Sequence, residues 1–151
     1  MQFTPGLNKW DNWFMKQAFV AAEMSKDPST KVGAVIVKDR RVISTGYNGP
    51  PRGVLDHIPA RNERSEKYFW YEHAERNAIY NAAAFGMALA GAAIYCFWMP
   101  CHDCARAIIQ SGLVEIVYYE TMPDRWNESQ ERAIEMLTEA KIVHRRFGGN
   151  R

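Results

Sequence analysis

Hydrophobic residues follow two different periods along the chain, and these periods predict the order of its elements. Apolar side chains recur at helical spacing from about 8 to 25. Two strand-like runs follow, VGAVIV at 32–37 and the alternating RVISTGYNG at 41–49, separated by the turn Asp39-Arg40. An apolar run rich in β-branched residues beside an alternating one predicts a buried strand and its hairpin partner.

The rest of the chain continues this alternation. Three helical segments alternate with three short apolar runs, at 74–85, 92–98, 101–112, 113–119, 126–140 and 141–147. Residues 49–71 contain three prolines and are predicted to form one long loop. Strands that alternate with helices after a hairpin predict a single α/β domain over 1–151, a three-layer α/β/α sandwich around a five-stranded mixed sheet.

One uncharged stretch, 82–99, is eighteen residues long and meets the length criterion for a membrane span. Gly86 and Gly91 interrupt it where a turn would fall, so it is interpreted as a helix end, a turn and a buried strand. Lys9 and Asp11 interrupt the N-terminus before any apolar signal segment. No membrane association is predicted.

Composition narrows the classes of function. The chain has 151 residues, 47% of them apolar, which is enough for the core of one domain. A net charge of +2 gives no support for a long nucleic-acid footprint, although a small anionic ligand needs only a few local cations. Three cysteines cannot all pair within one chain, which favours a reducing, cytoplasmic setting.

Three candidate metal ligands lie at the starts of predicted helices: His73, Cys101 and Cys104. Zinc binds thiolates and imidazoles, and a catalytic zinc keeps one position open for water. The positive end of a helix favours the thiolate form of cysteine. We therefore predict one zinc ion held by these residues, and we interpret Cys96, inside a predicted strand, as a small core residue.

Glu75 adds the carboxylate that a purely structural zinc site would not need. On a regular helix, at about 100° per residue, Glu75 and His73 would point to different sides. They converge only if His73 lies at the irregular start of the helix. His73-Ala74-Glu75 and Pro100 to Cys104 match H-x-E…P-C-x-x-C, the zinc deaminase signature in which the glutamate is a general acid and base. Hydrolytic deamination, with Glu75 as the proton shuttle, is predicted.

Four segments together resemble the deoxycytidylate (dCMP) deaminase family: SKDPSTKVGAVIV (25–37), GYNGPPRG (46–53), HAERNAI (73–79) and PCHDCARAIIQSG (100–112). The resemblance covers about 25–120. It implies a cytidine deaminase-like fold and conversion of a free deoxycytidine nucleotide, dCMP, to dUMP and ammonia. It also implies a homo-oligomer, because the family is commonly hexameric.

The resemblance assigns further residues to the substrate. Asn48 is expected to contact the nucleoside through its amide, although a plain Asn-Gly turn is the alternative interpretation. Ala74 is a further substrate-binding candidate. Lys26 and Asp27 resemble residues on the phosphate and sugar side, with simple surface placement of Lys26 nearly as well supported.

Aromatic residues offer two more contacts. Tyr118 or Tyr119, at the end of a predicted strand, either closes the sugar side or belongs to the core. Phe97 and Trp98 form a bulky pair before the cysteine motif, and we expect them to reshape the base pocket.

Segment 49–71 is relevant to three expectations: the number of zinc ions, the response to a nucleotide effector and the binding of a phosphate. Some relatives hold a second, structural zinc there, but this segment has only His57 and no cysteine, so one zinc per chain is expected. Arg52 lies where the family often carries its response to a nucleotide effector. The segment supplies local positive charge for a phosphate through Arg52, Arg61, Arg64 and Lys67.

Three alternatives stay open. The substrate is dCTP instead of, or as well as, dCMP. A tRNA or single-stranded DNA deaminase would want a basic channel with stacking aromatics, and basic residues cluster only weakly, at Arg145 and Arg146. A non-catalytic, zinc-stabilised nucleotide-binding module would not need Glu75.

Overall fold

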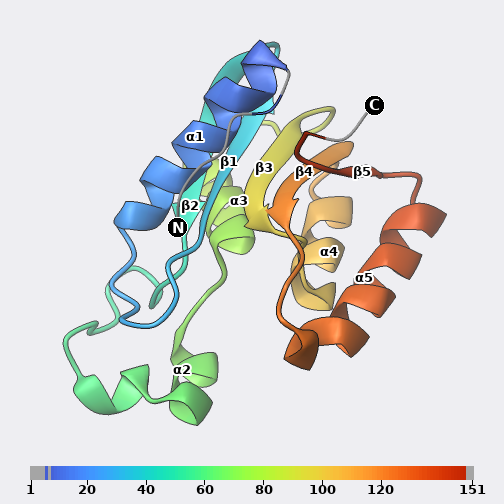
Figure 1. The fold of residues 1–151 in the computed structure, drawn as a ribbon. Coiled ribbons are helices and arrows are strands. Elements are labelled where there is room, and N and C mark those ends of the chain that lie inside the picture. The colour runs from blue at the N-terminus through green and yellow to red at the C-terminus, as the bar shows by residue number, and fades with distance from the viewer. Residues whose placement is uncertain (1–5, 7, 149–151) are drawn as a thin grey trace.

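A computed structural model describes residue 6 and residues 8–148 of the chain. Five strands form one mixed sheet in the order β2-β1-β3-β4-β5 (Figure 1). The first three pair antiparallel, and β4 and β5 continue parallel to β3. The strands are β1 (Gly33–Lys38), β2 (Arg41–Tyr47), β3 (Ala93–Trp98), β4 (Glu115–Glu120) and β5 (Val143–Arg146). The predicted sheet is confirmed.

The predicted hairpin turn is also confirmed. Asp39 and Arg40 have φ angles of 50° and 59°. Positive φ at both central residues is what a two-residue turn of type I′ requires, and its twist matches that of the flanking strands. The turn brings β2 to the edge of the sheet beside β1.

Helices cover both faces of the sheet, as the three-layer prediction required (Figure 1). α1 (Lys9–Glu23) lies on one face, where Phe14 and Met15 are buried against Val35, Tyr95 and neighbouring side chains. The opposite face packs against three helices. These helices are α3 (Ala74–Ala84), α4 (His102–Gln110) and α5 (Asn127–Glu139).

The prediction of one long loop over 49–71 was wrong. The segment contains a 3₁₀ turn, η1 (Pro59–Asn62), and a short helix, α2 (Arg64–Trp70), beyond one end of the sheet. A helix of seven residues is too short to produce a clear periodic pattern. Its position is set by a tertiary contact, because the Lys67 ammonium lies 2.8 Å from the Asp27 carboxylate.

The uncharged stretch 82–99 is divided as expected. α3 ends at Ala84, Gly86 and Gly91 both have positive φ, and β3 begins at Ala93. Within the described residues, no helix is both long and apolar enough to cross a membrane.

Two glycines let helices lie directly on the sheet. A Cβ atom at Gly33 would lie 2.0 Å from the carbonyl oxygen of Ala18 in α1. A Cβ atom at Gly46 would lie 2.2 Å from the carbonyl oxygen of Ala74 and 2.3 Å from the nitrogen of Ala78, both in α3. Real Cβ atoms do not approach backbone so closely, so both contacts depend on the missing side chain.

A buried charge cluster ties α1 to β3, β4 and β5. The Arg145 guanidinium lies 2.8 Å from the Asp11 carboxylate and 2.8 Å from that of Glu115. The Tyr95 hydroxyl donates to Asp11 at 2.8 Å. Burial, reinforced by that hydrogen bond, raises the pKa of Tyr95 well above its usual range. The tyrosine therefore remains a neutral donor to the carboxylate.

Replacing Tyr95 by phenylalanine should lower the free energy of unfolding by about 1.5 kcal/mol, because Asp11 loses a buried charge-assisted hydrogen bond. Urea unfolding measures the change. Tyr80→Phe is the matched control, since that ring is 52% exposed, and its effect should stay within about 0.5 kcal/mol. Equal stability of the two variants would contradict a stabilising role for the Tyr95 hydroxyl.

Candidate active site

The three predicted metal ligands converge where the N-termini of α3 and α4 meet. His73 is the N-cap of α3 and Cys101 is the N-cap of α4, both with extended backbone. Neither side chain caps its own helix by a hydrogen bond. Cys104 lies in the first turn of α4, so its thiol joins the other two donors.

The distances between the donor atoms fit zinc. Nδ1 of His73 lies 3.4 Å from Sγ of Cys101 and 3.5 Å from Sγ of Cys104. In a tetrahedral zinc site, nitrogen and sulfur ligands are separated by about 3.5 Å, given Zn–S and Zn–N bonds of about 2.3 and 2.0 Å. Cys101 is 2% exposed and Cys104 is fully buried. The His/Cys/Cys set is thus a binding site for one Zn²⁺.

The thiols differ in their readiness to ionise. The hydrogen bond from Cys104, assisted by His73, lowers the pKa of Cys101 to about 4 in spite of burial, whereas burial and that same hydrogen bond raise the pKa of Cys104 well above its usual range. Cys96 lies in β3, and burial raises its pKa well above the usual range. Its sulfur is 3.1 Å from the carbonyl oxygen of Trp98. Cys96 is a core thiol and belongs to no cluster of three metal donors among the described residues.

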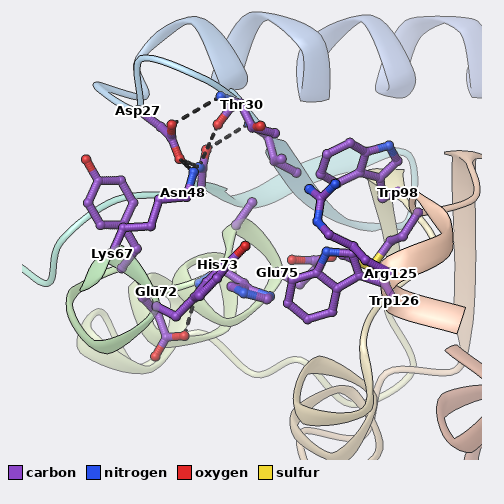
Figure 2. A pocket seen from close by; sticks show the side chains of 15 residues that line it. Asp27, Thr30, Asn48, Lys67, Glu72, His73, Glu75, Trp98, Arg125 and Trp126 are labelled. Atoms are coloured by element: carbon purple, nitrogen blue, oxygen red, sulfur yellow. Dashed lines mark hydrogen bonds and ion pairs between the residues drawn. The ribbon is translucent and has the colours of Figure 1, made fainter. Parts of the chain in front are cut away.

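Glu75 reaches the metal site without adding a fourth ligand to the cluster. It lies in the first turn of α3, is 4% exposed, and its Oε2 is 3.6 Å from Sγ of Cys104. Its carboxylate is seen beside the imidazole of His73 in Figure 2. The two side chains converge because His73 has extended rather than helical backbone. Burial raises the pKa of Glu75, which suits a group that accepts and releases a proton.

Ion pairs hold the two helix starts together. Glu72 accepts a hydrogen bond from the backbone N–H of His73 at 3.0 Å and pairs with Arg76. Arg76 also lies 3.6 Å from the Asp103 carboxylate of α4. These contacts position the ligands from outside the metal site.

A pocket that is partly open to solvent lies above His73 and Glu75, with about 640 Å³ of empty space when the open solvent at its mouth is included (Figure 2). One wall is largely polar and the other largely aromatic. The polar wall includes Asp27, Thr30, Asn48 and Lys67, and the aromatic wall includes Trp98, Met122, Arg125 and Trp126.

Asn48 lines this pocket, but its amide also holds the wall together. Its Oδ1 accepts from the N–H of Val32 at 2.8 Å, and its Nδ2 donates to the carbonyl of Thr30 at 2.9 Å and to Asp27 at 3.3 Å. Both amide protons are engaged, so the capacity left for a ligand is the second lone pair of Oδ1.

The structure brings Asp27 to the pocket and leaves Lys26 outside it. Asp27 is buried, and the hydrogen bond from Lys67 and those from Ser29 and Thr30 lower its pKa although burial opposes this. Lys26 is an exposed side chain that bonds Asp56 at 2.6 Å and does not line the pocket. Lys67 is the lysine that lies beside Asp27, because α2 folds against this wall.

Of the other residues predicted to bind substrate or effector, some line the pocket and some lie outside it. Ala74, the first residue of α3, is fully buried and lines the pocket. Tyr118 and Tyr119 are not among its lining residues: both pack against core side chains, and the ring of Tyr119 stacks on that of Phe97 at 5.6 Å. Arg52 lies in a separate surface cleft, where it donates to Asn81 at 2.8 Å.

Sequence reasoning missed the segment that supplies the aromatic wall. Met122, Arg125 and Trp126 lie between β4 and α5, around the 3₁₀ turn η2 (Asp124–Trp126). The Trp126 indole packs edge-on against the imidazole of His73, with centroids 6.1 Å apart. The available signal was a tryptophan beside an arginine in a proline-containing connection, at the end of the sheet where α/β proteins bind ligands.

Known proteins are similar to this chain in sequence. Residues 8–120 match the family described as the cytidine and deoxycytidylate deaminase zinc-binding region. The deoxycytidylate deaminase of Homo sapiens is 35% identical over 147 residues, which cover 92% of this chain and 80% of the human protein. That of Mus musculus is 38% identical over 129 residues, covering 82% and 70%.

A solved structure has the same fold. The dCMP deaminase of cyanophage S-TIM5, determined in complex with dCMP and dUMP, gives a TM-score of 0.76 at 23% identity, covering 96% of this chain and 99% of the phage chain. The family match extends over more than half of the sequence and includes all three zinc ligands. The chain therefore belongs to the deoxycytidylate deaminase family, within the zinc-dependent cytidine and deoxycytidylate deaminases.

Proposed function

We propose that the protein hydrolyses dCMP to dUMP and ammonia. The observation that carries this proposal is the buried carboxylate of Glu75, placed beside a His/Cys/Cys zinc site at the floor of a pocket that opens to solvent. A structural zinc site has no use for such a group, whereas hydrolysis of an amidine requires several proton transfers.

Zinc held by His73, Cys101 and Cys104 would supply an activated water at neutral pH. Glu75 would take one proton from the attacking water and deliver it to N3 of the cytosine ring as the new C4–O bond forms. It then passes the second proton to the exocyclic nitrogen, the C4–N bond breaks, and ammonia leaves. The raised pKa of Glu75 supports both its uptake and its release of protons.

The pocket supports one orientation of the nucleoside. The cytosine ring lies deep, next to His73 and Glu75, between the largely polar and largely aromatic walls. The backbone N–H of Ala74, at the start of α3, has no acceptor within the helix and is available to the base. The remaining lone pair of Asn48 Oδ1 is available to a sugar hydroxyl.

The charge distribution favours a free nucleotide over a polynucleotide. The predicted basic pair does not form a channel, because Arg145 is buried against Asp11 and Arg146 pairs with Glu120. A backbone-tracking groove needs a continuous row of available cations. dCTP remains the alternative substrate, since the same pocket opens to solvent where further phosphates would extend.

We also propose a cytoplasmic homo-oligomer, a hexamer by family resemblance. Large exposed side chains support association, with Phe69 84% and Phe85 79% exposed. Three free cysteines are consistent with a reducing compartment. Analytical ultracentrifugation of the zinc-loaded protein measures the assembly.

The substrate is tested by following ammonia and uracil products from deoxycytidine, dCMP, dCTP and a cytosine-containing oligonucleotide in parallel. dCMP should give the highest kcat/KM. Deoxycytidine should be roughly ten- to a hundred-fold poorer for each lost charged contact to phosphate. Equal rates for deoxycytidine and dCMP, or reaction of the oligonucleotide alone, would contradict the proposal while leaving the zinc chemistry intact.

A further inference from the structure

Arg125 is an exposed arginine on the wall of the pocket. It comes from η2, between β4 and α5, and in Figure 2 its guanidinium is seen between the indoles of Trp98 and Trp126. Among the described residues no hydrogen bond or ion pair engages this guanidinium. It lines the pocket without a protein anion to neutralise it.

The other cations near the pocket already have partners. Lys67 is held by Asp27 at 2.8 Å, and Arg76 pairs with Glu72 behind His73. Lys26 pairs with Asp56 outside the pocket. Within the described part of the chain, Arg125 is the lining cation that an anionic ligand can engage without breaking an existing ion pair.

The positions of Glu75 and Arg125 along the depth of the pocket indicate how a ligand would lie in it. Glu75 is 4% exposed and marks the floor, whereas Arg125 is exposed and marks the solvent side. A nucleotide whose base reaches Glu75 directs its phosphate outward. On the polar wall, the charges of Lys67 and Asp27 offset each other in an ion pair, so the positive charge that is not offset lies on the side of Arg125.

The segment that carries Arg125 is anchored. The ring of Trp126 packs edge-on against His73, at 6.1 Å, and against Tyr68, at 6.0 Å. Gln130, in α5, accepts from the backbone N–H of Met122 at 3.2 Å and donates to its carbonyl at 3.3 Å. The backbone on either side of Arg125 is therefore fixed by contacts that do not involve its guanidinium.

We propose that Arg125 binds the 5′-phosphate of the substrate and sets the preference of the enzyme for a nucleotide over a nucleoside. A guanidinium presents parallel N–H donors that match two phosphate oxygens. This inference rests on the proposed function, and it assigns the phosphate to the β4–α5 connection instead of to Lys26 or the 49–71 segment.

The test compares Arg125→Gln with the wild-type enzyme on dCMP and deoxycytidine. We expect kcat/KM for dCMP to fall roughly ten- to a hundred-fold, and that for deoxycytidine to be unchanged. Arg125→Lys should recover part of the loss, since a lysine keeps the positive charge but lacks the two parallel N–H donors. Arg132→Gln is the matched control, because it removes an exposed arginine of α5 that pairs with Glu128.

A binding measurement separates phosphate recognition from a general effect on the site. By calorimetry, Arg125→Gln should weaken dUMP roughly ten- to a hundred-fold and leave deoxyuridine as in the wild type. Equal losses for nucleotide and nucleoside, or no loss for dUMP, would overturn the assignment of Arg125. If wild-type enzyme fails to convert dCMP, it is the proposed function that fails; if it converts dCMP and Arg125→Gln does so equally, only the role of Arg125 fails.

Discussion

Replacing Glu75 by glutamine should remove most of the turnover of the enzyme while its zinc and its fold remain. The amide has nearly the same size as the carboxylate but cannot take up and release protons. General acid–base catalysis typically accounts for ~10²–10⁴-fold, and a group used in successive transfers accounts for more. The measurement is kcat for dCMP, with zinc content and thermal unfolding determined on the same preparation.

Glu66→Gln is the matched control for this experiment, since Glu66 is an exposed residue of α2 that bonds Trp70 away from the metal site. Its turnover should equal that of the wild type. Near-normal turnover in Glu75→Gln would remove the proposed proton shuttle. Loss of zinc from Glu75→Gln would instead show that the carboxylate is part of the metal site.

Replacing Cys101 by alanine should reduce bound zinc from about one per chain to nearly none, with complete loss of turnover. His73 and Cys104 would then remain as two ligands, fewer than the three protein ligands typical of a catalytic zinc site. Cys96→Ala is the control, because it also removes a buried thiol, but one that lies in β3 within the core. Elemental analysis decides: zinc lost from Cys96→Ala and kept by Cys101→Ala would show that the site is misassigned.

The zinc ion also joins segments that are far apart in the chain, since His73 precedes α3 and both cysteines belong to the start of α4. A ligand that binds only the folded chain stabilises it by about 2.7 kcal/mol when its concentration is a hundred times its Kd. Chelation of zinc from the wild type should therefore lower Tm as well as activity, and Cys101→Ala should show no further decrease with chelator.

The metal centre was predictable because its signals are local. His73, Glu75, Cys101 and Cys104 lie in two short motifs, and each motif falls at a helix start that the apolar periodicity locates. The prediction that His73 lies at an irregular helix start followed from the 100° rotation per residue, and its extended backbone confirms it.

The pocket walls were less predictable because they depend on which segments fold back over the metal. Lys67, forty residues from Asp27 in sequence, reaches that carboxylate only because a seven-residue helix forms within 49–71. Lys26 is adjacent to Asp27 in sequence but points to Asp56. Likewise, Tyr118 and Tyr119 are partly buried and pack against the core, while the irregular segment after them supplies Arg125 and Trp126. Periodicity carries no information about such tertiary contacts.

The close contact at Gly46 determines which substitutions the enzyme tolerates. β2 lies so near the first turn of α3 that one methyl group at position 46 would meet the carbonyl of Ala74. Relief of that overlap would shift His73 and Glu75 together, whereas Cys101 is carried by a different helix. In a mutant library selected for activity, position 46 should thus be as invariant as the zinc ligands, although it is not among the residues that line the pocket or hold the metal. Invariance at position 46 would result from the short distance between the backbones of β2 and α3, and not from a chemical role of the glycine.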